Sequence, residues 1–257
     1  MTGRVDLNAD MGEGFGLWTM GDDAALLDVV TSANVACGLH AGDWDVMAAT
    51  MAAAARRGVG IGAHPGFPDL NGFGRRRMEF SPASLRNLVA YQLGAAMAVA
   101  RSVGASVRHL KLHGALANMA AEDVALARTC FEAALDVDPD LVVMVMAGTA
   151  QQAAVSELGC NAACEIFADR AYTDDATLVD RSQPGAVIHE PTRAAARVVE
   201  MVAEGAIISE TGKRIPTRID TICLHGDTPT ALELSRNVRA ALAASGHGPE
   251  MFACRPL

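Results

Sequence analysis

The chain has 257 residues, of which 51% are hydrophobic and only 4% aromatic. We expect a single domain over residues 1–257, because α/β barrels commonly reach this length undivided. The formal net charge of −9 argues against nucleic acid as a partner, since phosphate backbones attract a basic surface. The sequence has no secretory signal pattern and no long uninterrupted apolar run, so we expect no membrane segment.

Cysteine usage bears on the cellular compartment. Six cysteines are scattered along the chain, at positions 37, 130, 160, 164, 223 and 254. They are too few and too dispersed for a disulfide scaffold of this length. We therefore expect reduced thiols and a cytoplasmic protein.

Short apolar segments alternate with helical patterns from end to end, which is typical of an α/β fold with parallel strands. Seven segments are expected to be strands, namely residues 4–9, 30–36, 59–63, 107–112, 141–146, 163–168 and 219–224. Start and stop signals predict a helix over 44–57 after Asp43, one from Ser81-Pro82 to Gly104, and one from Thr228-Pro229 to Gly246. Residues 205–217 are expected to form a hairpin.

Several of these strands carry polar side chains on one face only. In the first strand Asp6, Asn8 and Asp10 alternate with apolar residues, and adjacent strand residues point to opposite faces. The same parity groups His109, Lys111 and His113, groups Glu165 with Asp169, and places His225 opposite Leu224. A closed parallel barrel accounts for this pattern, because its active site lies at the C-terminal ends of the strands. An open doubly wound sheet would favour continuous apolar runs instead.

Four of the seven histidines lie at a strand end or in the loop that follows it: His40, His64, His113 and His225. Their common position predicts one site at the barrel mouth. Any single polar residue there could equally have a structural role, as Asp6 and Asn8 would have if they held neighbouring strands together. His109, His189 and His247 are given no role.

Six motifs resemble the LamB/YcsF family, in order and over most of the chain: "DLNADMGEGFG", "SANVACGLHAGD", "GAHPGFPDLNGFGRR", "KLHGALAN", "EIFADRAY" and "LHGDTP". The resemblance implies a distorted seven-stranded parallel β/α barrel of the TIM-like, glycoside hydrolase/deacetylase type. It also implies a role as the A subunit of a 5-oxoprolinase, which hydrolyses 5-oxo-L-proline to L-glutamate while ATP becomes ADP and phosphate. Two further subunits, PxpB-like and PxpC-like, would complete the complex.

The chain departs from the family pattern at four positions. Leu112 and Ala117 stand where the family usually has Pro and Tyr, and Ala176 and Asp180 stand where Gly and Pro are frequent. The first pair is next to His113, so these departures bear on substrate preference.

Opening a lactam requires a polarised carbonyl, a base for water and an acid for the leaving nitrogen. The candidates for catalysis are Asp10, Glu13, His40, Asp43, Lys111 and His113, with Glu13 and Asp43 as the favoured bases. The candidates for substrate binding are Asn8, Asn34, Arg75, Arg76, Glu165, Asp169 and His225. Lys111, Arg75 and Arg76 would also neutralise a phosphorylated intermediate.

A second likeness concerns metal. The placement of "NAD", "GAHPG" and "KLHG" is similar to the Asp-His-His site of YdjC-type sugar deacetylases, and it implies Asp10, His64 and His113 as ligands. Carboxylate and imidazole donors suit zinc, manganese or a similar divalent ion. In the alternative, the same groups act directly as acids and bases without a metal.

Two other functions stay open at this stage. One is a metal-dependent sugar deacetylase or amidohydrolase acting alone, and the other is a non-catalytic lactam-binding subunit. The chain has neither a P-loop nor a G-x-G-x-x-G motif, although the turns "GEGFG" at 12–16 and "GFGRR" at 72–76 could cradle an anion. We therefore expect ATP coupling to depend on the other subunits.

Overall fold

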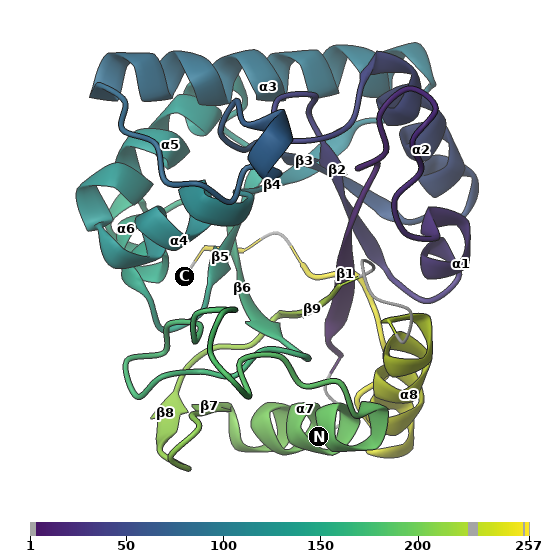
Figure 1. Ribbon diagram of the computed structural model, residues 1–257, viewed down its shortest axis with the longest axis vertical. Coiled ribbons are helices and arrows are strands. Elements are labelled where there is room, and N and C mark those ends of the chain that lie inside the picture. Colours follow the sequence, from purple (N-terminus) through teal and green to yellow (C-terminus); the bar gives the residue numbers. More distant parts are fainter. Residues whose placement is uncertain (1–3, 226–230, 254, 257) are drawn as a thin grey trace.

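The computed structural model describes residues 4–225, 231–253, 255 and 256. Within these residues seven parallel strands form a closed barrel (Figure 1). In barrel order they are β1 (Asp6–Met11), β2 (Ser32–Ala36), β3 (Gly60–His64), β4 (Val107–Lys111), β5 (Val142–Met146), β6 (Ala162–Phe167) and β9 (Thr221–Leu224). Strand β9 pairs with both β6 and β1, which closes the barrel. The predicted seven-stranded parallel barrel is confirmed.

Strand ends differ from the predicted ranges by one or two residues. The largest consequence is in β1, which we expected to stop at residue 9. Asp10 and Met11 continue the parallel pairing, opposite Asn34 and Val35. Asp10 therefore projects from the strand itself and not from the loop after it, which fixes its carboxylate more firmly.

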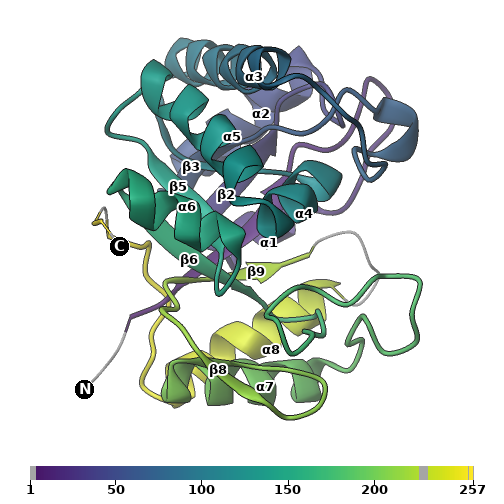
Figure 2. The same cartoon turned by 90° about the vertical axis from the view of Figure 1, so that its left-hand side faces the viewer.

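Helices follow the strands and cover the outside of the barrel (Figures 1 and 2). They are α1 (Asp23–Leu27), α2 (Trp44–Arg56), α3 (Pro82–Ser102), α4 (Gly114–Glu122), α5 (Val124–Val137), α6 (Ala150–Leu158), α7 (Pro191–Glu204) and α8 (Ala231–Ala244), with a short 3-10 turn at Leu70–Gly72.

The starts predicted at Asp43 and at Ser81-Pro82 are confirmed, since both side chains cap their helices. The start predicted at Thr228-Pro229 lies outside the described residues. Strands β7 (Ala206–Ile208) and β8 (Arg214–Pro216) form the predicted hairpin.

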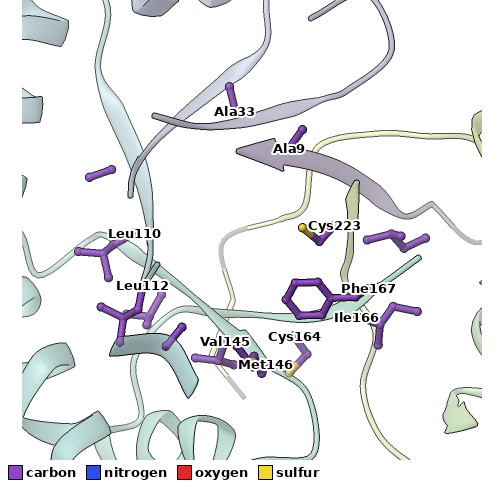
Figure 3. Packing of buried hydrophobic residues seen from close by; sticks show 14 of the residues in the cluster. Ala9, Ala33, Leu110, Leu112, Val145, Met146, Cys164, Ile166, Phe167 and Cys223 are labelled. Carbon is purple, nitrogen blue, oxygen red and sulfur yellow. The ribbon is translucent and has the colours of Figure 1, made fainter. Parts of the chain in front are cut away.

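The outward faces of the strands build the main core. Figure 3 shows part of it, including Ala9, Ala33, Leu110, Val145 and Ile166, all of them buried. Burial of this apolar surface between barrel and helices is the dominant stabilising contribution. The inward faces are then free to carry polar residues.

Asp6 joins three strands near the opposite end of the barrel from the mouth. Its carboxylate accepts hydrogen bonds from the hydroxyls of Thr31 (2.6 Å) and Ser32 (2.7 Å), and from Thr221 of β9. Asp6 therefore holds neighbouring strands together, which is the structural role that the sequence left open for it. Beside β5 and β6, a small apolar cluster fills this end: Val142, Met144, Ala163 and Phe252.

His109 points into the barrel on the same face of β4 as Lys111, beside an irregularity in the pairing of β3 and β4. Ile61 pairs with Val107 but Gly62 pairs with His109, so Arg108 is an extra residue in the ladder. A Cβ on Gly62 would lie 2.1 Å from His109 Nε2, so only glycine fits opposite this ring. His109 Nε2 donates to Asn34 Oδ1 at 2.8 Å. His109, which had no role assigned from its place in the sequence, therefore supports the floor of the mouth.

The five cysteines among the described residues are all free, as expected, and Cys254 lies outside that part of the chain. In the same part of the chain, no helix has the length and apolar character needed to cross a membrane.

The buried Asp6 predicts a pH-dependent stability. Burial raises its pKa to about 6, although hydrogen bonds from Thr221, Thr31 and Ser32 act in the opposite direction. The folded state then binds this proton more tightly than the unfolded chain, so ionisation of Asp6 lowers stability as the pH rises. Asp6→Asn imitates the neutral acid. The free energy of unfolding of the wild type minus that of Asp6→Asn should fall by roughly 3 kcal/mol between about pH 4 and pH 7.

Urea unfolding of both proteins across this pH range measures this difference in the free energy of unfolding. The contributions of the other carboxylates are the same in both proteins and therefore cancel. A difference that is constant with pH would contradict the assignment.

Candidate functional site

A cavity of about 580 Å³ opens at the C-terminal ends of the barrel strands. Seven of the predicted site residues line it: Asp10, Glu13, His64, Arg75, Lys111, His113 and His225. Its wall is completed by residues 177–181 of the segment between β6 and α7. Side chains far apart in the sequence thus meet at the mouth, as the strand parity indicated.

Lys111 lies at the floor of this cavity with its ammonium group buried. Its Nζ is 2.7 Å from Glu165 Oε1 and 3.1 Å from Asp10 Oδ1, and it donates to Asn8 Oδ1 at 3.3 Å. Burial alone would lower the pKa of Lys111, but the negative charges of Asp10 and Glu165 raise it well above its usual value. Lys111 is therefore a permanent cation.

Asp10 is held ionised by the groups around it. Its Oδ1 accepts from Asn34 Nδ2 at 2.9 Å as well as from Lys111, and its Oδ2 lies 3.3 Å from His64 Nε2. Burial would raise the pKa of Asp10, yet the charges of His64 and Lys111 hold it well below its usual value. Asn34 also donates to Asn8 (2.7 Å), so the two asparagines lie beneath the cavity and orient Asp10 and Lys111.

Beside Asp10 lies a second group, here called the imidazole cluster: Glu13, His40, His64 and His113. One potential donor atom from each lies within 4.8 Å of those of the others. The rings of His40 and His113 stack with centroids 3.7 Å apart, and His64 meets both edge-on. Glu13 Oε1 is 3.6 Å from His40 Nε2 and 3.9 Å from His113 Nε2.

Burial favours the uncharged form of two members of the imidazole cluster, His40 and His113. It lowers the pKa of His40 and of His113 well below the usual value, and the positive charge that His64 can carry lowers both further. Neutral imidazole is the form that binds a metal or accepts a proton. The cluster can therefore hold a divalent ion, with a membership that differs from the implied set of Asp10, His64 and His113.

On the other side of the cavity, His225 and Asp169 form an oriented pair. His225 Nδ1 is 2.7 Å from Asp169 Oδ1, and its Nε2 lies 3.2 Å from a guanidinium nitrogen of Arg181. Because a carboxylate only accepts, His225 donates from Nδ1 and keeps its Nε2 lone pair toward Arg181. Burial raises the pKa of Asp169, but the charge and hydrogen bond of His225 lower it overall.

Two predicted residues, Asp43 and Arg76, are engaged in contacts away from the cavity. Asp43 accepts from the backbone N–H groups of Asp45 and Val46, and from Gly16 at 2.7 Å, so its carboxylate caps α2. Arg76 forms an ion pair with Asp69, and its side chain is 67% exposed. Arg75 does line the cavity, and its guanidinium lies 4.9 Å above the Phe73 ring.

The departures from the family pattern cluster around the same cavity. Leu112, Ala117 and Asp180 line it, and Ala176 has the left-handed φ of 62° that glycine adopts without strain. Other lining residues were missed in the sequence: Arg77, Phe167, Arg170 and Arg181. Phe167 shares its strand face with Glu165, so parity could have identified it, whereas no local signal marks the arginines of the loops.

Comparisons with known proteins agree with this geometry. The model of the LamB/YcsF family matches residues 5–253. The chain is similar to the 5-oxoprolinase A subunit of Ruegeria pomeroyi, with 66% identity over 95% of this chain and 96% of that one. It is also similar to the lactam utilization protein from Thermus thermophilus, with a TM-score of 0.90 and 40% identity over 97% of this chain and 100% of that one.

A more distant likeness concerns the fold alone. A family 4 carbohydrate esterase from Streptomyces lividans has a TM-score of 0.50 and 11% identity, over 99% of this chain and 97% of that one. The barrel is therefore of the deacetylase type that the sequence led us to expect.

The buried ion pairs of Lys111 predict a large stability effect. Lys111→Met leaves Glu165 buried without its cation, and such a loss costs about 3 to 5 kcal/mol. The double variant Lys111→Met/Glu165→Gln removes both charges and should be less destabilised than Lys111→Met alone. Lys213→Met, at an exposed lysine, is the matched control and should change stability by less than about 1 kcal/mol.

Chemical denaturation of the four proteins gives the comparison. Equal losses in the single and double variants would show that the charges at this position are not energetically coupled.

Proposed function

Because the chain belongs to the LamB/YcsF family, we propose that it is the A subunit of a 5-oxoprolinase and that its mouth cavity is the ring-opening site. In this reaction 5-oxo-L-proline and water give L-glutamate, and ATP becomes ADP and phosphate. The observation that carries the proposal is the cationic Lys111 between Asp10 and Glu165 at the floor of the cavity. Fixed charges of this kind are suited to an amide whose carbonyl oxygen becomes negative during attack.

Lys111 is assigned to stabilise the carbonyl oxygen of 5-oxoproline. Its ammonium is fixed by Asp10 and Glu165, so little reorganisation is needed when negative charge develops on the oxygen. Arg75, which lines the same cavity, is assigned to the carboxylate of 5-oxoproline or to a phosphorylated oxygen, because a guanidinium binds both in a forked geometry.

The pair of His225 and Asp169 is assigned to protonate the leaving nitrogen of the lactam. An imidazole held by a carboxylate through Nδ1 can deliver a proton from Nε2 once it is protonated. Arg181 already lies against that Nε2, so substrate would have to replace this contact. In the alternative without a metal, Glu13, at the rim, is assigned as the base for water.

The remaining candidates are assigned supporting roles. Asn8, Asn34 and Glu165 position Asp10 and Lys111 from beneath and do not line the cavity. Asp43 and Arg76 are assigned no part in the chemistry, because one caps a helix and the other pairs with Asp69.

Partners and location complete the proposal. We infer that the chain acts in a complex with two further subunits, since its relatives are named as the first of several lettered subunits and its sequence lacks a P-loop. ATP binding is assigned to the assembled complex. A cytoplasmic location is inferred from the free cysteines of the described chain.

The function predicts a selective loss in Asp10→Asn. Without this carboxylate Lys111 loses one of its two partners, and turnover of 5-oxoproline by the complex should fall at least about a hundredfold. Asp123→Asn is the matched control, because Asp123 caps α5 outside the cavity and asparagine caps equally well. Glutamate release by the reconstituted complex measures both. Activity of Asp10→Asn within about threefold of the wild type would remove Asp10 from the site.

The dependence on partners predicts that the purified chain alone, given ATP, a divalent metal and 5-oxoproline, forms neither glutamate nor ADP. Adding the other two subunits should restore both products in equal amounts. Steady formation of glutamate and ADP by the chain alone would overturn this prediction. ATP-independent release of acetate from an acetylated sugar would favour the deacetylase alternative instead.

A further inference from the structure

The imidazole cluster contains buried nitrogen atoms with no hydrogen-bond partner among the described residues. They are both ring nitrogens of His40, Nε2 of His64 and Nδ1 of His113. Buried polar groups in folded proteins are almost always partnered, because an unpartnered group retains the full cost of leaving water. Of these atoms, Nε2 of His40 lies 3.6 Å from Glu13 Oε1 and Nε2 of His64 lies 3.3 Å from Asp10 Oδ2. These two nitrogens indicate a ligand that binds beside the carboxylates.

The orientation of His64 fixes which of its atoms faces that ligand. Its Nδ1 lies 2.8 Å from the carbonyl oxygen of Lys111, and a carbonyl only accepts, so Nδ1 carries the proton. The lone pair of His64 is then on Nε2, directed into the cluster. Histidines that bind metals are oriented in this way, by donating the other ring N–H to a backbone carbonyl or carboxylate.

Glycines fix the other two rings. A Cβ at Gly66 would lie 2.8 Å from His40 Nδ1, and a Cβ at Gly74 would lie 2.8 Å from His113 Nδ1. The Nδ1 sides of both rings are therefore packed against backbone. Their Nε2 atoms are the ones that face Glu13, at 3.6 and 3.9 Å. Phe73 meets both rings edge-on and closes the cluster from another side.

We propose that Glu13, His40, His64 and His113 bind one divalent first-row metal ion of the zinc type, through Glu13 Oε1 and three imidazole nitrogens. Three imidazoles and one carboxylate suit zinc and similar ions. The distances of Glu13 Oε1 from two of the nitrogens are close to those between ligands that share one small ion. When bound, the ion would act as a Lewis acid beside Lys111.

Asp10 is excluded from this ligand set. Its Oδ1 is bound by Lys111 and Asn34, and it is not among the four residues whose donor atoms all lie within 4.8 Å of one another. Its Oδ2 lies 3.3 Å from His64 Nε2. The site therefore differs from the Asp10, His64 and His113 set implied by sequence, and it rests on this geometry and not on the proposed reaction.

Metal binding by the full chain tests the proposal without any assay of turnover. Chelator-treated protein is dialysed against Zn²⁺ or Co²⁺, and metal content, calorimetric affinity and the Co²⁺ absorption spectrum are measured. The wild type should bind one ion per chain. His40→Gln and Glu13→Gln should each weaken binding more than about a hundredfold, and Asp10→Asn by no more than about tenfold. The exposed His189 provides His189→Gln as the matched control, with no change expected.

Opposite results overturn the proposal. One such result is that the wild type takes up neither Zn²⁺ nor Co²⁺. Another is that His40→Gln binds the ion as tightly as the wild type does. A third is that Asp10→Asn loses the ion while His40→Gln keeps it. Circular dichroism checks that each variant is folded. If His40→Gln does not fold, Glu13→Gln decides, because Glu13 is in a loop and partly exposed. These metal-binding measurements do not depend on whether the complex hydrolyses 5-oxoproline.

Discussion

The arrangement of the mouth depends on the buried ammonium group of Lys111. An isolated cation at this depth would be strongly destabilising, and it is compensated by carboxylates from two different strands, Asp10 on β1 and Glu165 on β6. The ion pairs reach across the barrel interior and so connect strands that are not neighbours. Lys111 in turn accepts the N–H of His64 at its carbonyl, which links the charged floor to the imidazole cluster.

The barrel interior is polar on one side and apolar on the other. Strands β1 to β4 direct Asn8, Asn34 and His109 inward, and these residues form one connected hydrogen-bond network. Strand β5 instead directs Val142 and Met144 inward, where Phe252 packs on them. A connected hydrogen-bond network of this kind restricts the side chains that it joins. It therefore holds Asp10 and Lys111 in one orientation while the loops above contribute Glu13, His40 and the arginines.

Alternation along the strands was enough to predict the barrel and part of the lining of the mouth cavity, because parity decides which residues share the inner face. It brought Asp10, Lys111, His113 and His225 together correctly. Loop residues carry no such periodicity, so Asp43 was expected in the site although its position after a loop suits a helix cap equally well. His109 went unassigned because it does not lie at a strand end, although parity had already placed it on the same face as Lys111.

The same reasoning explains why a carboxylate for the imidazole cluster comes from a loop. The strand carboxylates Asp10 and Glu165 already compensate Lys111, and moving either toward a second cation would leave the ammonium buried with too little negative charge. Glu13 lies beyond the end of β1, outside this ion-pair group, and faces His40 and His113 instead. The mouth thus separates into an ion-pair floor around Lys111 and a donor set of three imidazoles with one carboxylate. This division allows a divalent ion to be held without disturbing the charges on which the barrel interior depends.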